Sequence, residues 1–167
     1  ARNSLALFDQ TRKLHGLGDQ ERLLLHAAAL MHDVGYSADP ARHHKESRDL
    51  ILNARLEGFD PREVQIMACL ARYHRKAHPD KLHRVYRDLA EEDQSIVDRL
   101  AALLRIGDGL DRTHAQSARE LRIEHKKGLL RLCVRQDPPS EEDIRAAVRR
   151  ATWFEEVFGI KLEIVAE

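Results

Sequence analysis

Residues 23–33, LLLHAAALMHD, form the stretch that decides the fold of this chain. Apolar side chains lie on nearly every side of the helix that this stretch predicts, which is typical of a central helix in a core. Asp19 is a suitable N-cap for its first turn, and the apolar run stops near Val34 and Gly35. We therefore expect a buried helix that ends in two potential metal ligands, His32 and Asp33.

Four further segments have the spacing of amphipathic helices. They cover residues 4–15, 44–56, 61–75 and 93–108. The start of the third is the clearest, because Asp60, Pro61 and Glu63 supply an N-cap, a proline at the first helical position and the carboxylate of a capping box. The sequence therefore predicts a mainly α-helical body.

The pattern changes after Ala118. Residues 120–136, ELRIEHKKGLLRLCVRQ, alternate apolar and polar side chains about a Lys-Gly turn, which predicts a β-hairpin. Ser140 and the acidic residues after it open another helix to about Phe158, and residues 161–167, KLEIVAE, have the pattern of a final strand. We expect a helical domain over residues 1–118 and a small α+β subdomain with a ββαβ order over residues 119–167.

The overall composition excludes several classes of protein. With 28 basic and 28 acidic residues the formal charge is zero, so nothing indicates a membrane surface or sequence-specific nucleic acid as partner. Cys69 and Cys133 lie in apolar runs, which favours reduced thiols and a cytoplasmic location. No apolar stretch approaches the roughly 18 residues of a membrane span and no signal-peptide pattern opens the chain, so we expect neither membrane insertion nor secretion. The first residues have the pattern of the middle of a helix, so we expect a piece of a longer protein.

Two more helices also end in potential ligands. Asp108 follows Leu100 and Leu104 at helical spacing, which places its carboxylate on the apolar face. His74 follows Met67 and the apolar residues after it in the same way. A buried carboxylate without a cation or hydrogen-bond donor costs several kcal/mol, so apolar packing alone does not account for this arrangement.

Imidazoles and carboxylates together favour borderline or hard divalent ions such as Mn²⁺, Fe²⁺, Zn²⁺ or Mg²⁺. Such an ion lowers the pKa of a bound water towards ~7 and polarises a phosphoryl oxygen, which points to hydrolysis of phosphate bonds. With five ligands, one or two ions per chain are possible, and Asp33 is the candidate bridge between two.

Basic residues surround the candidate ligands in the sequence, and they could bind a polyanion. They are Arg42, Lys45, Arg48, Arg72, Arg75 and Lys76. Taken singly, each of them is better explained as part of a solvated surface, and only as a group do they indicate a polyanion site. His43, beside His44, is expected to be exposed, and His26 is expected to be a hydrogen-bonded core residue.

Four motifs carry a resemblance to a known family: LMHDVGY (30–36), HHKESRDLI (43–51), RYHRKAHP (72–79) and LLRIGDGLDRT (103–113). In this order they resemble the C-terminal HD-type domain of the exopolyphosphatase and guanosine pentaphosphate phosphohydrolase family, within the HD phosphohydrolase superfamily. The resemblance implies an HD-type helical bundle and a ligand set of His32, Asp33, His44, His74 and Asp108. It also implies a first histidine on the opening helix, at a place before this chain begins, and an N-terminal pair of ATPase-fold domains to which polyphosphate cleavage is attributed.

Two functions follow as expectations. The first is a metal-dependent phosphohydrolase that cleaves phosphoanhydride or phosphoester bonds in polyphosphate or nucleotide-like substrates, with Asp33, Arg75 and Lys76 in the catalytic machinery. The alternative is a non-catalytic module that binds polyphosphate or supports dimerisation for an ATPase-fold partner domain. For His32 and Asp33 the alternative is a hydrogen-bonded pair at a helix end, but His44, His74 and Asp108 follow in the order of the superfamily, which favours metal binding.

Overall fold

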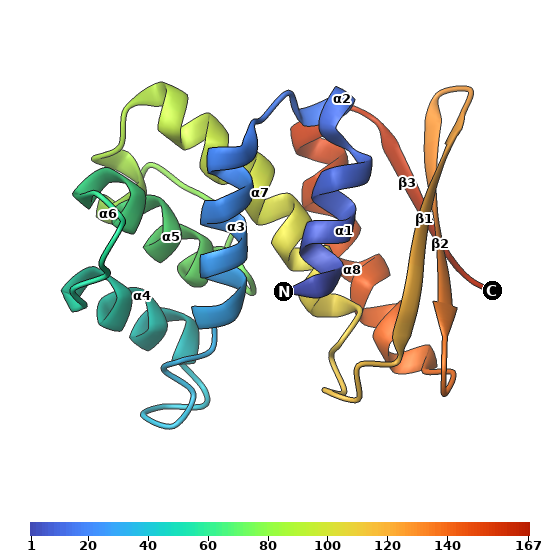
Figure 1. Ribbon diagram of the computed structural model, residues 1–167, viewed down its shortest axis with the longest axis horizontal. Coiled ribbons are helices and arrows are strands. Elements are labelled where there is room, and N and C mark those ends of the chain that lie inside the picture. Colours follow the sequence, from blue (N-terminus) through green and yellow to red (C-terminus); the bar gives the residue numbers. More distant parts are fainter. The chain divides into compact units, whose positions relative to one another are not determined.

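A computed structural model describes residues 1–167 and contains eight helices and three strands (Figure 1). Helices predominate and the strands form one small sheet, which confirms the predicted mainly α fold with a small β part. No helix combines the length and apolar composition that a membrane span needs. The chain divides into two compact units, residues 18–101 and residues 1–17 with 102–167.

The unit of residues 18–101 is entirely helical. Helix α5 lies at its centre and packs against α3, α4 and α6 (Figure 1). Every residue from Ile66 to Ala71 in α5 is 0% exposed. The unit contains α3 (Asp19–Met31), α4 (His43–Asn53), α5 (Pro61–Tyr73), α6 (Arg84–Arg87) and the beginning of α7 (Glu91–Gly109).

Helix α5 begins where the sequence predicts. The Asp60 carboxylate accepts a hydrogen bond from the Glu63 backbone N–H at 2.8 Å, and the Glu63 carboxylate accepts one from the Asp60 N–H at 3.0 Å. This reciprocal capping box satisfies two backbone donors that the first turn leaves without partners. The helix ends at Tyr73, and His74 follows at its C-cap in a helical conformation. The C-terminal end of the most buried helix therefore carries a histidine.

Helix α3 is less buried than the sequence suggested. Leu24, Leu25 and the alanines at 28 and 29 are buried, whereas Leu23 and Leu30 are 45% and 67% exposed. The expectation of burial on all sides was wrong. A helix packed on one neighbour buries one stripe, here the stripe facing α5, and the central position belongs to α5 instead.

The second unit confirms the predicted ββαβ order. Strand β1 (Ala118–Lys126) pairs antiparallel with β2 (Leu129–Gln136) across the predicted turn, and β2 pairs in parallel with β3 (Lys161–Ala166). Helix α8 (Glu141–Phe158) makes the crossover between β2 and β3 and buries Phe154 against the sheet. A parallel pair needs such a crossover, which explains the helix between the last two strands.

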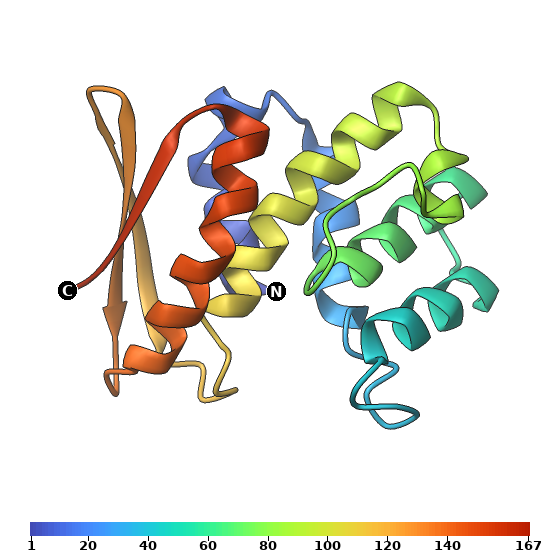
Figure 2. The same cartoon turned by 180° about the vertical axis from the view of Figure 1, so that it is seen from behind.

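Helix α1 (Arg2–Gln10) lies with α8 on the same side of the sheet (Figures 1 and 2). The Gln10 side-chain amide donates to the Leu121 carbonyl at 2.8 Å and accepts from the Ile123 N–H at 2.8 Å, so it acts as a short strand partner for β1. A short helix, α2 (Arg12–His15), follows.

The end of α7 also belongs to this second unit. A Cβ at Gly107 would lie 2.3 Å from the Ser4 Oγ, and one at Gly109 would lie 2.8 Å from the Ala147 Cα. The two glycines thus permit close packing of α7 against α1 and α8. Helix α1 and the end of α7 thus belong to the same compact unit as the ββαβ element, and the domain boundary after residue 118 stays a prediction.

Candidate metal centre

Three histidines of the unit 18–101 surround the carboxylate of Asp33. His32 Nε2 lies 3.2 Å from Asp33 Oδ2, while His43 Nε2 and His74 Nε2 lie 3.1 Å and 3.4 Å from Asp33 Oδ1. The His43 and His74 Nε2 atoms are themselves 3.2 Å apart. These residues come from the end of α3, the start of α4 and the end of α5. Elements distant in the sequence therefore bring four potential ligands to one place.

The same local hydrogen bond orients all three rings. Each Nδ1 lies close to the carbonyl oxygen three residues earlier in the chain: His32 to Ala29 at 3.0 Å, His43 to Pro40 at 2.8 Å and His74 to Ala71 at 2.7 Å. A carbonyl only accepts, so each Nδ1 carries the proton and donates it. The Nε2 atom is then the one that each ring presents to Asp33. Metal-bound histidines are commonly oriented by this kind of second hydrogen bond.

The spacing of these atoms suits a cation. Ligand atoms ~2.1 Å from one ion lie roughly 3.0 Å apart in octahedral and roughly 3.4 Å apart in tetrahedral coordination. Three of the distances, among Asp33 Oδ1 and the Nε2 atoms of His43 and His74, form one triangle of 3.1 to 3.4 Å, and His32 Nε2 lies 3.2 Å from the other Asp33 oxygen. Nitrogen lone pairs and carboxylate oxygens at this separation repel one another unless a proton or a metal ion lies between them. The residues present therefore fit a divalent metal.

The cluster has a buried side and an accessible side, as a metal site that admits a substrate needs. His43 and His74 are 4% and 1% exposed, whereas about a third of the Asp33 side chain, 34%, is exposed. A buried ring holds its orientation, and the partly open carboxylate leaves one side of the cluster accessible. His32, Asp33 and His74 by themselves place one ligand atom each within 4.8 Å of one another.

Gly35 brings the loop after α3 against α4. Its N–H donates to the Ser47 Oγ at 2.9 Å. A Cβ at this position would lie 2.5 Å from the Ser47 backbone nitrogen and 2.6 Å from the Glu46 Cβ, distances that real Cβ atoms do not show. Only glycine permits this approach, which sets the separation between Asp33 and the histidine at the start of α4.

The expected ligand His44 is next to the cluster, with its ring centroid 6.1 Å from that of His43. His44 is 3% exposed, and its Nδ1 is buried without a hydrogen-bond partner. Burial, and then the nearby charges of Arg72, Lys76 and Arg75, lower the pKa of His44 to about 4. Its neighbour His43, which we expected to be exposed, is the histidine of α4 that contacts the Asp33 carboxylate.

Asp108 belongs to the other compact unit. Its side chain is 15% exposed, as its position on the apolar face of α7 predicts, and its carboxylate accepts a hydrogen bond from Arg150 of α8. The same guanidinium donates to the Arg105 carbonyl at 3.2 Å. The role of Asp108 as a fifth ligand stays a prediction.

The predicted cations separate into groups. Arg75 Nη1 lies 3.3 Å from His43 Nε2, so Arg75 borders the cluster. Lys76 donates to the Ala41 carbonyl at 2.8 Å, from a left-handed backbone with φ of 58°. Arg42 is exposed at the N-cap of α4, with no cap hydrogen bond from its side chain.

The other three cations, Lys45, Arg48 and Arg72, lie around His83. Arg48 makes a two-point ion pair with Asp49, and the Arg72 Nη2 lies 3.4 Å from the His83 Nε2. Burial, and then the charges of Arg72, Arg48 and Lys45, lower the pKa of His83, although Asp80 opposes them. Sequence reasoning did not connect His83 with these residues, because His83 lies in a segment without a periodic pattern.

The fold and the cluster define a mainly helical domain with a histidine and aspartate site. Residues 1–145 match the model of a protein family described as Ppx/GppA phosphatase, domain III. Because this match covers most of the chain, the chain belongs to that family, as its four motifs indicated. Membership of the wider HD superfamily is consistent with this match.

Proposed function

We propose that this chain is a metal-dependent phosphohydrolase domain that cleaves phosphoanhydride or phosphoester bonds in polyphosphate or nucleotide-like substrates. The observation that carries the proposal is the convergence of three oriented Nε2 atoms on the Asp33 carboxylate at 3.1 to 3.4 Å. Membership of a phosphatase family supports phosphate esters or anhydrides as the substrate class.

The ligand cluster in this proposal is His32, Asp33, His43 and His74, with His43 in place of the expected His44. A bound Mn²⁺, Fe²⁺, Zn²⁺ or Mg²⁺ ion would supply Lewis acidity at the phosphoryl oxygen and lower the pKa of a water molecule. The chain's own residues orient the donors: the Nδ1 hydrogen bonds fix the rings, and both Asp33 oxygens face imidazoles.

In this proposal Arg75 and Lys76 bind the phosphate of the substrate. Arg75 borders His43, and its planar guanidinium can donate two parallel hydrogen bonds to phosphate oxygens. Lys76 is exposed and held beside the loop before α4 by its bond to Ala41. Their positive charge favours the negative charge that develops on the phosphoryl oxygens during in-line displacement.

The test combines metal content with turnover. The purified chain is equilibrated with Mn²⁺, freed of excess ion and analysed for metal, and phosphate release is measured from polyphosphate and from a nucleoside triphosphate. We expect bound metal and turnover in the wild type, and loss of both in Asp33→Asn. His125→Ala, an exposed histidine in the β-hairpin, is the matched control and is expected to behave as wild type. Wild-type protein that holds no divalent metal would contradict the proposal.

The second candidate is a non-catalytic module that binds polyphosphate or supports dimerisation for an ATPase-fold partner domain. The exposure of Arg42 and Lys76 near the start of α4 favours it, because accessible cations bind polyanions whether or not a metal is present. Polyphosphate binding that survives Asp33→Asn, together with no turnover in the wild type, would select this candidate.

A further inference from the structure

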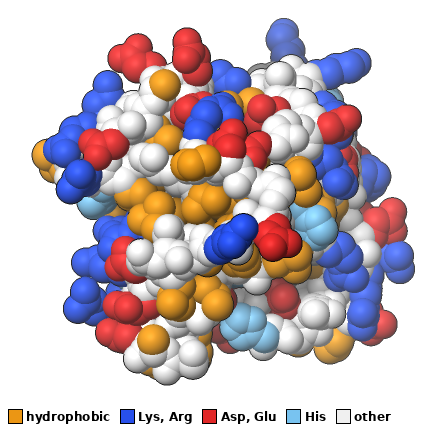
Figure 3. Space-filling model, turned by 60° about the vertical axis from the view of Figure 1, so that its left-hand side comes forward, with side chains coloured by type: hydrophobic (Ala, Val, Ile, Leu, Met, Phe, Trp, Pro, Cys, Tyr) orange, Lys and Arg blue, Asp and Glu red, His pale blue; other side chains and the backbone are white.

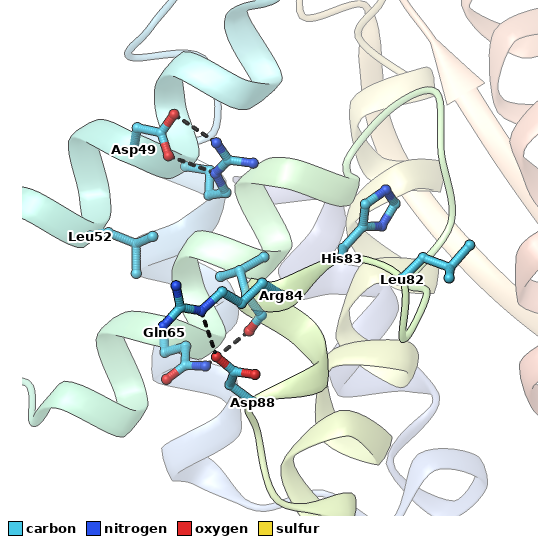
Figure 4. Close-up of a pocket in the computed structure, with 9 residues that line it drawn as sticks. Asp49, Leu52, Gln65, Leu82, His83, Arg84 and Asp88 are labelled. Atoms are coloured by element: carbon cyan, nitrogen blue, oxygen red, sulfur yellow. Dashed lines mark hydrogen bonds and ion pairs between the residues drawn. The ribbon is translucent and has the colours of Figure 1, made fainter.

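A cavity of about 510 Å³ lies in the unit 18–101 beside α4, α5 and α6 (Figure 4). Asp49 and Leu52 of α4 line one side of it, and His83 and Leu82 line the other. Its volume falls in the range of small-molecule sites, about 300 to 1,000 Å³. The cavity is also lined by Arg48, Gln65, Arg84, Val85 and Asp88.

Arg72 lies directly behind this wall. Its side chain is 5% exposed, and its Nη2 donates to the Nε2 of His83 at 3.4 Å. Its Nε and Nη1 are buried and have no hydrogen-bond partner. A guanidinium keeps its charge and its five donors in every protein environment. A buried Arg72 with unmatched donors is therefore costly unless an anion approaches it.

The acidic residues of the cavity hydrogen-bond to arginines other than Arg72. Asp49 accepts two hydrogen bonds from Arg48, both at 2.7 Å. Asp88 accepts one from Arg84 at 3.1 Å. Each carboxylate thus already has its own hydrogen-bonded cation, whereas the Arg72 guanidinium contacts the His83 imidazole and lies 5.7 Å from the centroid of the Tyr73 ring. The surplus of positive charge at the cavity selects an anionic ligand.

The cavity also has an apolar wall. Leu52 and Leu82 are 40% and 86% exposed, and Val85 joins them. On the face drawn in Figure 3, apolar side chains gather in a hollow flanked by Lys and Arg side chains. The volume is far larger than an inorganic phosphate ion needs. A ligand that fills the cavity must therefore combine an anionic group with an apolar or planar portion.

We propose that this cavity is a second binding site, for a small organic phosphate such as a nucleoside monophosphate. The phosphate reaches the Arg72 guanidinium beside His83, and the planar portion packs on Leu52 and Leu82. Arg48 and Arg72, expected from the sequence to bind substrate at the metal cluster, thereby belong to a different site. The inference goes beyond the proposed function, because the cavity contains none of the cluster residues and needs no metal.

Isothermal titration calorimetry at low salt, without metal, tests the site with adenosine 5′-monophosphate, inorganic phosphate and adenosine. We expect adenosine 5′-monophosphate to bind more tightly than inorganic phosphate and more tightly than adenosine. Arg72→Met should weaken it about tenfold or more, the effect of losing a charge-assisted hydrogen bond. Arg55→Met, which removes an exposed cation of the same unit, is the matched control and should leave the affinity unchanged.

A second variant guards against a folding defect. Leu82 is at the rim and 86% exposed, so Leu82→Ser should fold and should weaken the monophosphate but not inorganic phosphate. Amide chemical shifts should move around residues 82–88 on titration. The proposal would be overturned if inorganic phosphate bound as tightly as the monophosphate, or if the monophosphate did not bind at millimolar concentration. It would also be overturned if the chemical shifts changed only at residues 32–43 and 74–76 and monophosphate binding were lost in Arg75→Met.

Discussion

Gly35→Ala tests whether backbone packing sets the geometry of the metal cluster without altering any ligand. The added Cβ would lie 2.5 Å from the Ser47 nitrogen. An ordinary contact needs about 3.4 Å, so the loop and α4 must separate by roughly 0.9 Å, several times the ~0.2 Å tolerance of metal–ligand distances. His43 would then move away from Asp33.

We expect the variant to bind Mn²⁺ or Zn²⁺ about 10 to 100 times more weakly, as for the loss of a supporting contact around a metal. Its free energy of unfolding should fall by about 1 to 3 kcal/mol, which is typical of overpacking. Affinity is measured by competition with a chromophoric chelator and stability by urea unfolding. In the control, Gly18→Ala, the Cβ meets only the flexible end of the Glu21 side chain at 3.3 Å. A folded Gly35→Ala protein with wild-type metal affinity would refute the reasoning.

Three further predictions concern single side chains. His43→Gln should weaken divalent-metal binding at least about tenfold in chelator competition, whereas His44→Gln should not; the reverse order would restore His44 as the ligand. Burial raises the pKa of Asp98, although the Tyr86 hydroxyl donates to it at 2.9 Å and opposes the shift. As the pH rises, the Asp98 carboxyl ionises at a lower pH in the unfolded chain than in the folded one, so the free energy of unfolding falls above about pH 4. Asp98→Asn should therefore be more stable than wild type in urea unfolding at pH 7 but not at pH 3. Asp60→Ala removes the N-cap of α5 and should lower the free energy of unfolding by about 1 kcal/mol, while an unchanged urea midpoint would show that the capping box adds nothing.

The fold was largely readable from local signals. The capping box at Asp60, the Lys-Gly turn and the alternation in β1 and β2 each depend on residues a few positions apart, and the structure has all of them. Burial of α3 was misjudged because a run of apolar residues does not show how many neighbours a helix has. Leu30 is apolar and yet 67% exposed.

The candidate site was only partly predictable, for a geometric reason. His43 and His44 are adjacent on α4, and successive helical residues point about 100° apart. The sequence contains both histidines but not the rotation of α4 about its axis, and that rotation turns His43 towards Asp33. The contact between Arg72 and His83 depends on the conformation of the loop after α5, which a periodic sequence pattern does not predict.

The identity of the ligand cluster is the central claim, and anomalous X-ray scattering from crystals grown with Mn²⁺ tests it most directly. The account predicts a peak at the metal edge bounded by Asp33 and the Nε2 atoms of His32, His43 and His74. A peak coordinated by His44 without His43, or no peak beside Asp33 at saturating Mn²⁺, would contradict it.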